Sequence, residues 1–342
     1  MKKKKKYSVL IVGAGQIGCF YDKPKSKNVL THAHAVTKNT RLALAGICDI
    51  DSLRAKKAAK IWKTNFFSSI EQAFKKAKPD IVVISCSTEN HLSLFRDALV
   101  YRPKFIVLEK PLAYRETEAA EIYHLARNAR VPVLVNYLRR FDSTVRKLKA
   151  SIAKYGAFLG GSGFYCKGIK NNGSHMLDLL QYLVGSPTQI QVTEAISDTH
   201  SQDLTVGGSL SFSGAPFHLV PIHKDQLQVF ELTLLFEKAR VHFKDYGENF
   251  LIETVQKRPK TGFGPEIKPS FKILKTKLSF SFQEVTNSII QYLDYGKSFE
   301  STIDTAYQTE KLVHEIFKRA QQTRQKKAAV EGQNLKAHDR LL

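Results

Sequence analysis

Six residues near the start of the chain, Gly13-Ala14-Gly15-Gln16-Ile17-Gly18, form a G-x-G-x-x-G turn. The turn follows the apolar, β-branched run Tyr7–Val12, which is the context that a dinucleotide-binding turn requires. In such a turn the first glycine allows a tight bend, the second lets the backbone approach a pyrophosphate, and the third lets helix and strand pack closely. We therefore expect a dinucleotide to bind here, the alternative being a purely structural turn. The residues expected to contact it are Gly13, Gly15, Gln16, Ile17 and Gly18.

An acidic residue, Asp49, follows the second apolar run, Leu42–Cys48. A carboxylate at this place usually accepts hydrogen bonds from the adenosine ribose and repels a 2′-phosphate, so it favours NAD over NADP. Asp49 lies 31 residues after Gly18 rather than about 20, and we interpret the excess, within 19–40, as an insertion beside the cofactor. Arg54 would soften the exclusion of NADP. The alternative role for Asp49 is to cap the next helix.

Two further residues have types and positions suited to proton transfer. Lys110 lies at the carboxyl end of the apolar strand Phe105–Leu108, where a nicotinamide is expected, and Pro111 fixes the backbone after it, in a bond that can be cis. Such a lysine can hydrogen-bond a substrate hydroxyl, although a lone strand-end lysine is more often a solvated charge. His175 lies near the start of the helix expected over Ser174–Val184. A neutral imidazole there can take an alcohol proton, the alternative being a plain surface role.

The elements that position these residues alternate between strand and helix up to about residue 137. Near-continuous apolar strands between helices indicate a parallel sheet covered on both faces, which binds ligands at the carboxyl ends of its strands. The expected strands are Tyr7–Val12, Leu42–Cys48, Asp80–Ser85, Lys104–Leu108 and Val131–Asn136. The expected helices are Ser52–Trp62, capped by Asp51, then Ser69–Ala77, Asn90–Val100 and Glu116–Ala129.

After about Ser151 the pattern changes to alternating strands, which indicates an antiparallel sheet with one face buried and the other free for helices or a partner subunit. The expected strands are Phe158–Lys167, Thr188–Ile196, Leu204–Phe212, Phe217–Ile222, Leu227–Phe236, Arg240–Lys244 and Phe250–Val255. Residues 256–270 are expected to form a loop, and helices are expected over Phe282–Tyr295 and Ile303–Thr323. We expect a nucleotide-binding domain over 1–137, a substrate and oligomerisation domain over 138–320, and a basic tail over 321–342.

Four motifs occur in order: GAGQIG, the turn from Ser85 to His91, Glu109-Lys110-Pro111, and the run from Gly173 to Asp178. Over residues 7–320 this set resembles the glucose–fructose oxidoreductase and inositol dehydrogenase family (Gfo/Idh/MocA). The resemblance implies an NAD(P)-dependent oxidoreductase that acts mostly on sugars, cyclitols or their derivatives. It implies a doubly wound parallel Rossmann sheet, followed by an α+β domain whose large, mostly antiparallel open sheet packs against its mate in a homodimer or homotetramer.

The resemblance also assigns roles to single residues. Lys110 and His175 stand at the family's catalytic positions, and Pro111 at its usually cis proline. Asn171 stands where the dehydrogenases usually carry aspartate, four residues before the histidine; asparagine can bind substrate or orient His175 but cannot hold charge. Asp178 either supplies the missing carboxylate or anchors its helix. The other expected cofactor-binding residues are Ser85, Thr88, Asn90, His91, Glu109 and Lys110, and the other expected substrate-binding residues are Tyr137 and Arg140.

The formal net charge of +22, from 53 Lys+Arg against 31 Asp+Glu, first suggests nucleic acid, an anionic membrane or an anionic small molecule. The two ends hold nearly half of this excess, +5 in Lys2–Lys6 and +5 from Lys318 to Leu342. The chain shows no RNA-binding aromatic signature, zinc knuckle or helix-turn-helix. We therefore expect no nucleic acid partner, and the remaining charge fits a dinucleotide and an acidic or phosphorylated sugar.

Membrane, export and metal binding are not expected either. No apolar run reaches the roughly 18–20 residues that span a bilayer, and the run after Lys2–Lys6 is too short for a signal peptide. The four cysteines form no C-x-x-C pair, and His32 and His34 have no neighbouring cysteine or acid, so no metal site is indicated. We expect a soluble, cytoplasmic protein in which these two histidines begin the helix after the insertion.

These expectations combine into a mechanism. A secondary alcohol of a sugar, cyclitol or nucleotide sugar is oxidised reversibly with NAD, NADP being possible. His175 takes the hydroxyl proton, Lys110 orients that oxygen, and hydride passes to the nicotinamide, while Asn171, Arg140 and Tyr137 bind hydroxyls. The asparagine at 171 leaves an alternative open, a catalytically weak sensor that binds NAD and a sugar.

Overall fold

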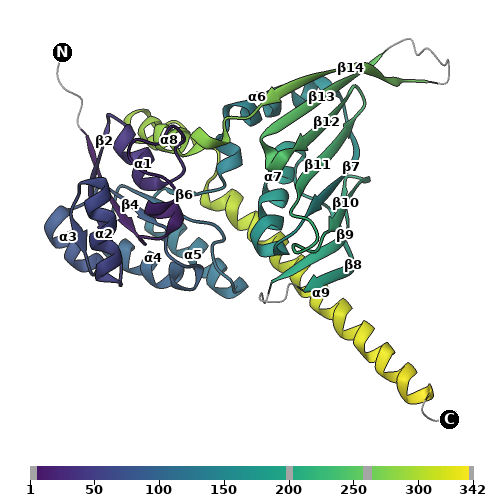
Figure 1. Cartoon of the computed structure of the whole chain (residues 1–342), viewed down its shortest axis with the longest axis horizontal. Coiled ribbons are helices and arrows are strands. Elements are labelled where there is room, and N and C mark those ends of the chain that lie inside the picture. Colours follow the sequence, from purple (N-terminus) through teal and green to yellow (C-terminus); the bar gives the residue numbers. More distant parts are fainter. Residues whose placement is uncertain (1–5, 198–202, 257–263, 339–342) are drawn as a thin grey trace. The chain divides into compact units, whose positions relative to one another are not determined.

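The computed structural model describes residues 6–197, 203–256 and 264–338, and the chain forms two compact units (Figure 1). The first unit combines Met1–Val145 with Lys277–Glu310, and the second combines Arg146–Thr276 with Lys311–Leu342. The chain therefore passes from one unit to the other three times. Residues 277–310, expected from the sequence to lie with the substrate domain, are grouped with the nucleotide-binding residues.

The first unit contains a six-stranded parallel sheet in the order β3-β2-β1-β4-β5-β6, with helices between the strands. Its strands are β1 (Tyr7–Val12), β2 (Leu42–Cys48), β3 (Phe66–Phe67), β4 (Ile81–Ile84), β5 (Phe105–Leu108) and β6 (Val133–Val135). Its helices are α1 (His32–Lys38), α2 (Ser52–Trp62), α3 (Ile70–Ala77), α4 (His91–Val100), α5 (Glu116–Ala129) and α8 (Ser281–Tyr295). This confirms the doubly wound parallel sheet expected from the sequence.

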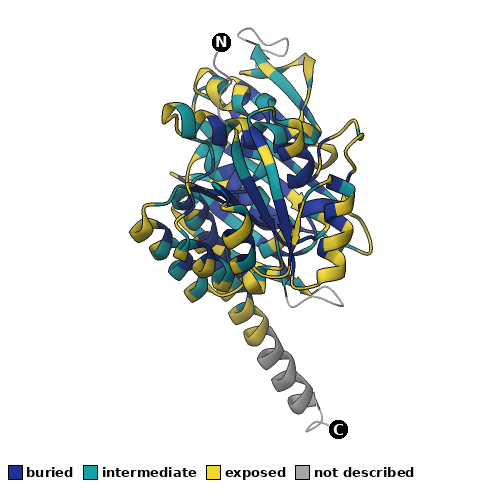
Figure 2. Ribbon diagram, turned by 90° about the vertical axis from the view of Figure 1, so that its left-hand side faces the viewer, coloured by how far each residue is buried: buried dark blue, intermediate teal, exposed yellow. Residues whose placement is uncertain are grey.

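Apolar side chains fill the first unit on both faces of this sheet. The strands β4, β5 and β6 are buried throughout, while β2 and β3 are partly exposed; Figure 2 shows the burial along the ribbon. On one face they pack against α3, α4 and α5, for example Ile84 and Ile106 against Phe95. On the other they pack against α1, α2 and α8, for example Val107 and Ile289. Burial on both faces explains why the strands are continuously apolar rather than alternating.

The second unit contains an eight-stranded sheet in the order β14-β13-β12-β11-β7-β10-β9-β8; among the described strands of this unit, only β7 and β10 pair in parallel. Its strands are β7 (Phe158–Tyr165), β8 (Gln189–Ser197), β9 (Leu204–Phe212), β10 (Ala215–Pro221), β11 (Phe230–Phe236), β12 (Ala239–Lys244), β13 (Asn249–Gln256) and β14 (Glu266–Lys275). The helices α6 (Ser143–Ser151) and α7 (Ser174–Val184) precede and interrupt this sheet along the chain. The mostly antiparallel sheet of the α+β expectation is thus confirmed.

Alternation along β11 separates the two faces of this sheet. Phe230, Leu232, Leu234 and Phe236 are buried, while the residues between them are partly or well exposed. Helix α7 packs on the buried face, where its Met176 side chain lies so close to Gly163 of β7 that a Cβ there would overlap it. The opposite face bears exposed apolar side chains, namely Phe164, Leu235, Phe271 and Ile273.

Two sequence expectations in the second half are wrong. Residues 256–270 are not all loop, because β14 begins at Glu266 and pairs with β13; residues 257–263 lie outside the described part of the chain. Frequent lysines and Pro269 are typical of a loop, so the sequence did not indicate a strand here. Both features are also typical of an edge strand. The last helix, α9 (Ile303–His338), continues well past Thr323, because the residues that follow are mostly strong helix formers. No helix in the described residues has the length and apolarity needed to cross a bilayer.

Candidate functional site

The glycine turn follows β1, and its three glycines have different reasons to be glycine. Gly13 has a φ of +103°, and a Cβ there would overlap the backbone of Cys86. A Cβ on Gly18 would overlap the carbonyl oxygen of Gly13. A Cβ on Gly15, by contrast, would meet only the carbonyl oxygen of Ser85, at 3.8 Å. The fold itself therefore requires the outer glycines, whereas the middle one leaves open space beside the turn.

Asp49 follows β2 and is tied to this turn. Its Oδ2 accepts a hydrogen bond from the Ala14 amide at 2.7 Å, and its Oδ1 accepts one from the Asp51 amide and one from Arg54, both at 2.9 Å. Burial raises the pKa of the Asp49 carboxyl, but these hydrogen bonds outweigh it and hold the pKa below its usual value. Asp51, not Asp49, caps α2, since it accepts from the amides of Leu53 and Arg54.

Two apolar side chains beside Asp49 are unusually exposed, and sequence reasoning did not select them. Ile50 is 93% exposed and Leu53 is 81% exposed, at the junction of β2 and α2. Large apolar side chains that stay in water are commonly part of a binding surface. Here they lie beside a carboxylate suited to a ribose, where the flat, apolar face of an adenine would cover them.

The loop after β4 contains three of the expected cofactor residues. Ser85 is buried, and its hydroxyl donates to the carbonyl oxygen of Gly13 at 3.0 Å, so it supports the glycine turn. Thr88 and Asn90 form the short helical turn that opens α4, and Asn90 is exposed and donates to Ser87 Oγ at 2.9 Å. Thr88 and Asn90 therefore remain accessible, whereas Ser85 acts from beneath the turn.

His91, the first residue of α4, is fully buried. Its Nδ1 lies 3.0 Å from the carbonyl oxygen of Pro111 and 3.2 Å from that of Leu112, so this nitrogen carries the proton and donates. Burial lowers the pKa of the His91 imidazole, which keeps it neutral. The side chain thus supports the turn that contains Lys110.

Glu109, between β5 and Lys110, is buried in a polar network. Its Oε1 accepts from His32 Nε2 at 2.8 Å and from Asn136 Nδ2 at 2.5 Å, and its Oε2 accepts from the Lys110 amide at 3.3 Å. Burial raises the pKa of the Glu109 carboxyl, but the hydrogen bonds from His32 and Asn136 outweigh it and hold the pKa below its usual range. The carboxylate is therefore ionised and anchors the turn.

The peptide bond between Lys110 and Pro111 is cis, as the sequence allowed. The amide of Leu112, which follows, donates to Oε1 of Glu310 at 3.0 Å, and the same oxygen accepts from the Tyr137 hydroxyl at 3.2 Å. Glu310 is buried in the first half of α9, 198 residues from Leu112. Sequence reasoning missed it, because no local pattern marks a helix carboxylate that binds a distant backbone amide.

Tyr137 and Arg140, expected to bind substrate, are both buried. The Tyr137 hydroxyl donates to Glu310, and Arg140 donates to the carbonyl oxygen of Glu300 at 3.3 Å. Both side chains therefore stabilise the segment that follows β6.

The predicted insertion has its own buried polar centre. The Asp22 carboxylate accepts from the Leu30 amide at 2.7 Å, from Thr31 Oγ1 at 2.6 Å and from His34 Nδ1 at 2.6 Å. Helix α1 begins at His32, as expected, and Thr31 caps it by accepting from the His34 amide. Helix α1 thus places the His32 side chain in hydrogen-bonding contact with Glu109. Among the described residues, no three His, Cys, Asp or Glu side chains gather as metal ligands would.

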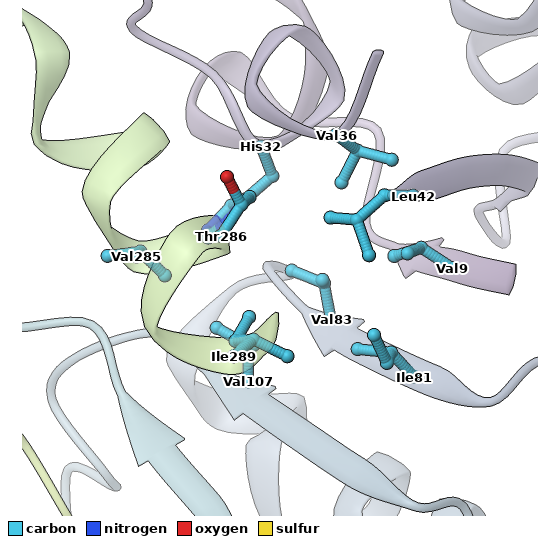
Figure 3. A pocket seen from close by; sticks show the side chains of 10 residues that line it. All are labelled: Val9, His32, Val36, Leu42, Ile81, Val83, Val107, Val285, Thr286 and Ile289. Atoms are coloured by element: carbon cyan, nitrogen blue, oxygen red, sulfur yellow. The ribbon is translucent and has the colours of Figure 1, made fainter. Parts of the chain in front are cut away.

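A small cavity lies between the parallel sheet and the helices α1 and α8 (Figure 3). Its volume is about 10 Å³, which is at the lower limit for one water molecule. It is lined by Val9, His32, Val36, Leu42, Ile81, Val83, Val107, Val285, Thr286 and Ile289. The cavity is too small for a cofactor or a sugar. The expected cofactor residues of the first unit lie instead after the carboxyl ends of β1, β2, β4 and β5.

The second unit contains Asn171 and His175. Asn171 is exposed within a short π-helical segment, Gly168–Gly173, and His175 is half-buried in the first turn of α7. The Asn171 carbonyl oxygen accepts from Ser174 Oγ at 2.7 Å, which joins the segment to the helix. Asp178 is buried on α7. The structure thus brings Asn171 and His175 together, while the other expected site residues belong to the first unit.

Comparisons with known proteins bear on the family and on the fold. Residues 7–137 match the Gfo/Idh/MocA model, described as an oxidoreductase family with an NAD-binding Rossmann fold. A search of curated protein sequences finds no match.

Solved structures resemble the chain over most of its length. An oxidoreductase from Agrobacterium radiobacter in complex with NAD+, L-tartaric acid and magnesium is 16% identical, with a TM-score of 0.74 over 92% of this chain and 96% of that one. UDP-N-acetylglucosamine 3-dehydrogenase from Acidithiobacillus ferrooxidans is 13% identical (TM-score 0.72; 93% and 99%). An NAD-binding protein from Listeria innocua is 20% identical (TM-score 0.71; 93% and 96%). At these identities the likeness establishes the fold.

Proposed function

The chain belongs, through its NAD-binding Rossmann domain, to the Gfo/Idh/MocA oxidoreductase family, and on this premise we propose that it oxidises or reduces a secondary alcohol or ketone of a sugar, cyclitol or nucleotide sugar. The observation that carries the proposal is the open space at Gly15 beside an ionised Asp49. No contact within the fold requires glycine at position 15, whereas a closely approaching pyrophosphate does.

The residues present fit a dinucleotide. Amides at the start of a helical turn have no partner within it and suit a phosphate, and such amides follow Gly15. Asp49 suits the ribose hydroxyls, and Ile50 and Leu53 offer an apolar surface to the adenine. Asp49 favours NAD, while Arg54, already bound to Asp49 and half-exposed, would pair with a 2′-phosphate, so NADP is also accommodated. When bound, the dinucleotide supplies the hydride acceptor or donor.

We assign the proton chemistry to Lys110 and His175. His175 takes the proton of the substrate hydroxyl in the oxidative direction and returns it in the reductive direction. Lys110 hydrogen-bonds a substrate oxygen, and its turn is fixed by Glu109, His91 and Glu310. Asn171, one helical turn before His175, hydrogen-bonds the substrate in place of an aspartate.

The experiment compares the wild type with Lys110→Ala and His175→Gln, with Lys104→Ala, at the opposite end of β5, as a matched control. Lys104 is half-exposed and pairs with Asp80, away from the strand's carboxyl end. Each protein is incubated with NAD or NADP and a panel of sugars, cyclitols and nucleotide sugars, and the absorbance of the reduced nicotinamide is followed. Both site variants should lose roughly a hundredfold or more in kcat while keeping their NAD affinity. A wild-type rate in Lys110→Ala would refute the assignment.

A second candidate function rests on Asn171. An asparagine cannot stabilise an imidazolium by charge, so a sensor that binds NAD and a sugar without turnover is the alternative. Calorimetric binding of a sugar in the presence of NAD, with no absorbance change in either direction, would favour the sensor.

We further propose that the exposed face of the eight-stranded sheet pairs with the same face of a second copy, giving a homodimer or a homotetramer. Phe164, Leu235, Phe271 and Ile273 expose apolar surface there. Beside them, Arg240 and His242 share the Glu253 carboxylate. Light scattering of the wild type and of Phe271→Glu would test this, since a charge on the face should yield the monomer.

We propose a cytoplasmic location. All four cysteines are free, which suits a reducing compartment. Fractionation of the native cells by immunoblot would test it.

A further inference from the structure

The π-helical segment that carries Asn171 is capped by a carboxylate that sequence reasoning did not select. Asp203 lies directly before β9, 32 residues after Asn171. Its Oδ2 accepts from the amide of Lys170 at 3.0 Å and from the amide of Asn171 at 3.1 Å. Its Oδ1 accepts from its neighbour Leu204 at 2.9 Å. One side chain thus satisfies two backbone amides of the segment.

The chain reaches this carboxylate through an unusual bend. Lys167 and Gly168 have consecutive positive φ values, +66° and +82°. A Cβ on Gly168 would overlap the Asp203 carboxylate, so glycine is needed both for the bend and for the close approach. The Gly168 amide donates to Thr205 Oγ1 at 2.9 Å, also at the start of β9. Two side chains at the start of β9, those of Asp203 and Thr205, therefore bind three backbone amides of the segment.

The segment is in turn linked to the start of α7 by a hydrogen bond. The Asn171 carbonyl oxygen accepts from Ser174 Oγ at 2.7 Å, and His175 is the next residue. Resting on the proposed function, we propose that Asp203 is a positioning residue that fixes the backbone of Gly168–Gly173 and thereby sets the placement of Asn171 and His175.

The asparagine at 171 does not leave this part of the second unit without a carboxylate. A carboxylate is present in this part of the second unit, but it binds the backbone of the segment rather than projecting from it. Burial raises the pKa of the Asp203 carboxyl above its usual value despite the amides that bind it. Burying this carboxylate costs free energy, and the hydrogen bonds that its oxygens accept from the amides of Lys170 and Asn171 offset part of that cost.

The test uses the full-length protein with Asp203→Asn, and Asp225→Asn as a matched control. Asp225 is an exposed aspartate of the same unit, and its only described partner is the nearby His223 at 3.6 Å. The imidazole resonances of His175 are identified by their loss in His175→Gln and followed by NMR across a pH titration. We expect Asp203→Asn to change the chemical shifts and titration midpoint of His175 but not those of His218, which is exposed on β10.

A His175 spectrum identical in Asp203→Asn and Asp225→Asn would overturn the proposal. If Asp203→Asn does not fold, Thr205→Val, which removes only the acceptor of the Gly168 amide, should produce a smaller change of the same kind. The absence of that change would likewise overturn it.

Steady-state kinetics give a second, independent test. With an accepted substrate, Asp203→Asn should lower kcat roughly ten- to a hundredfold while its NAD affinity matches that of Asp225→Asn. If the wild type turns over no substrate, the proposed function fails, but the NMR comparison still decides the role of Asp203.

Discussion

His32 Nε2 donates a hydrogen bond to Glu109 Oε1 at 2.8 Å, and both side chains are buried. This contact joins the first helix after the insertion to the residue before Lys110, 77 positions away. The Lys110 turn is therefore supported by the insertion, although the insertion lies far from it in the sequence.

Removing His32 should leave the buried Glu109 carboxylate without one of the hydrogen bonds that offset the cost of burying its charge. We expect His32→Ala to lower the free energy of unfolding by about 3 kcal/mol, measured by urea denaturation. Adding Glu109→Gln to that variant removes the uncompensated charge and should restore about 1 kcal/mol or more. Strictly additive effects of the two substitutions would contradict this coupling.

The glycine turn offers a pair of matched substitutions. Gly15→Ala places its Cβ in open space, so stability should stay at the wild-type level while NAD affinity falls roughly tenfold or more. Gly18→Ala forces its Cβ into the Gly13 carbonyl and should destabilise the protein by about 1–3 kcal/mol. Thermal unfolding and NAD titration check both, and unchanged NAD binding in Gly15→Ala would argue against a pyrophosphate at this turn.

Asp49 should contribute to stability in a pH-dependent way. Its folded pKa is held below the usual value, so the unfolded chain binds this proton more tightly. The stabilisation is complete above the unfolded pKa of about 3.9 and is lost as pH falls through the lower folded value. The difference in unfolding free energy between wild type and Asp49→Asn should stay constant from about pH 7 to 5 and shrink below about 4. A difference that shrinks already near neutral pH would show that the carboxyl has no lowered pKa.

The Cys86 thiol, beside the glycine turn, should react slowly. Burial raises its pKa to about 12, so its thiolate at pH 8 is roughly a thousandfold rarer than that of an exposed cysteine. A disulfide reagent should therefore modify Cys86 far more slowly in the native protein than in urea, with peptide mapping to identify the site. Native and unfolded rates within tenfold of each other would contradict the raised pKa.

Local patterns were enough to predict the elements that frame the site. The helices Ser52–Trp62 and Glu116–Ala129 have the predicted bounds, and Asp51 caps the first of them as expected. Strands such as Phe105–Leu108 could be predicted because a buried parallel strand is apolar on both faces. The spacing of the glycine turn follows from the same strand-to-helix geometry.

The contacts that fix the site residues could not be predicted, because they join polar residues far apart in the sequence. Glu310 reaches Leu112 across 198 positions, and Asp203 reaches Asn171 across 32. A single aspartate or glutamate has no periodicity that identifies its partner. The edge strand β14 was not predicted because its lysines and proline are also typical of a loop.

The division of the chain also imposes an order on its synthesis. The six-stranded sheet is complete at Val135, but Val285 and Ile289 of α8, which cover one face of it, are made about 150 residues later. At about 5–20 residues per second, a ribosome needs roughly 8–30 s to reach them. The part of this face that α8 covers therefore has no cover from α8 while the second unit's sheet is being translated.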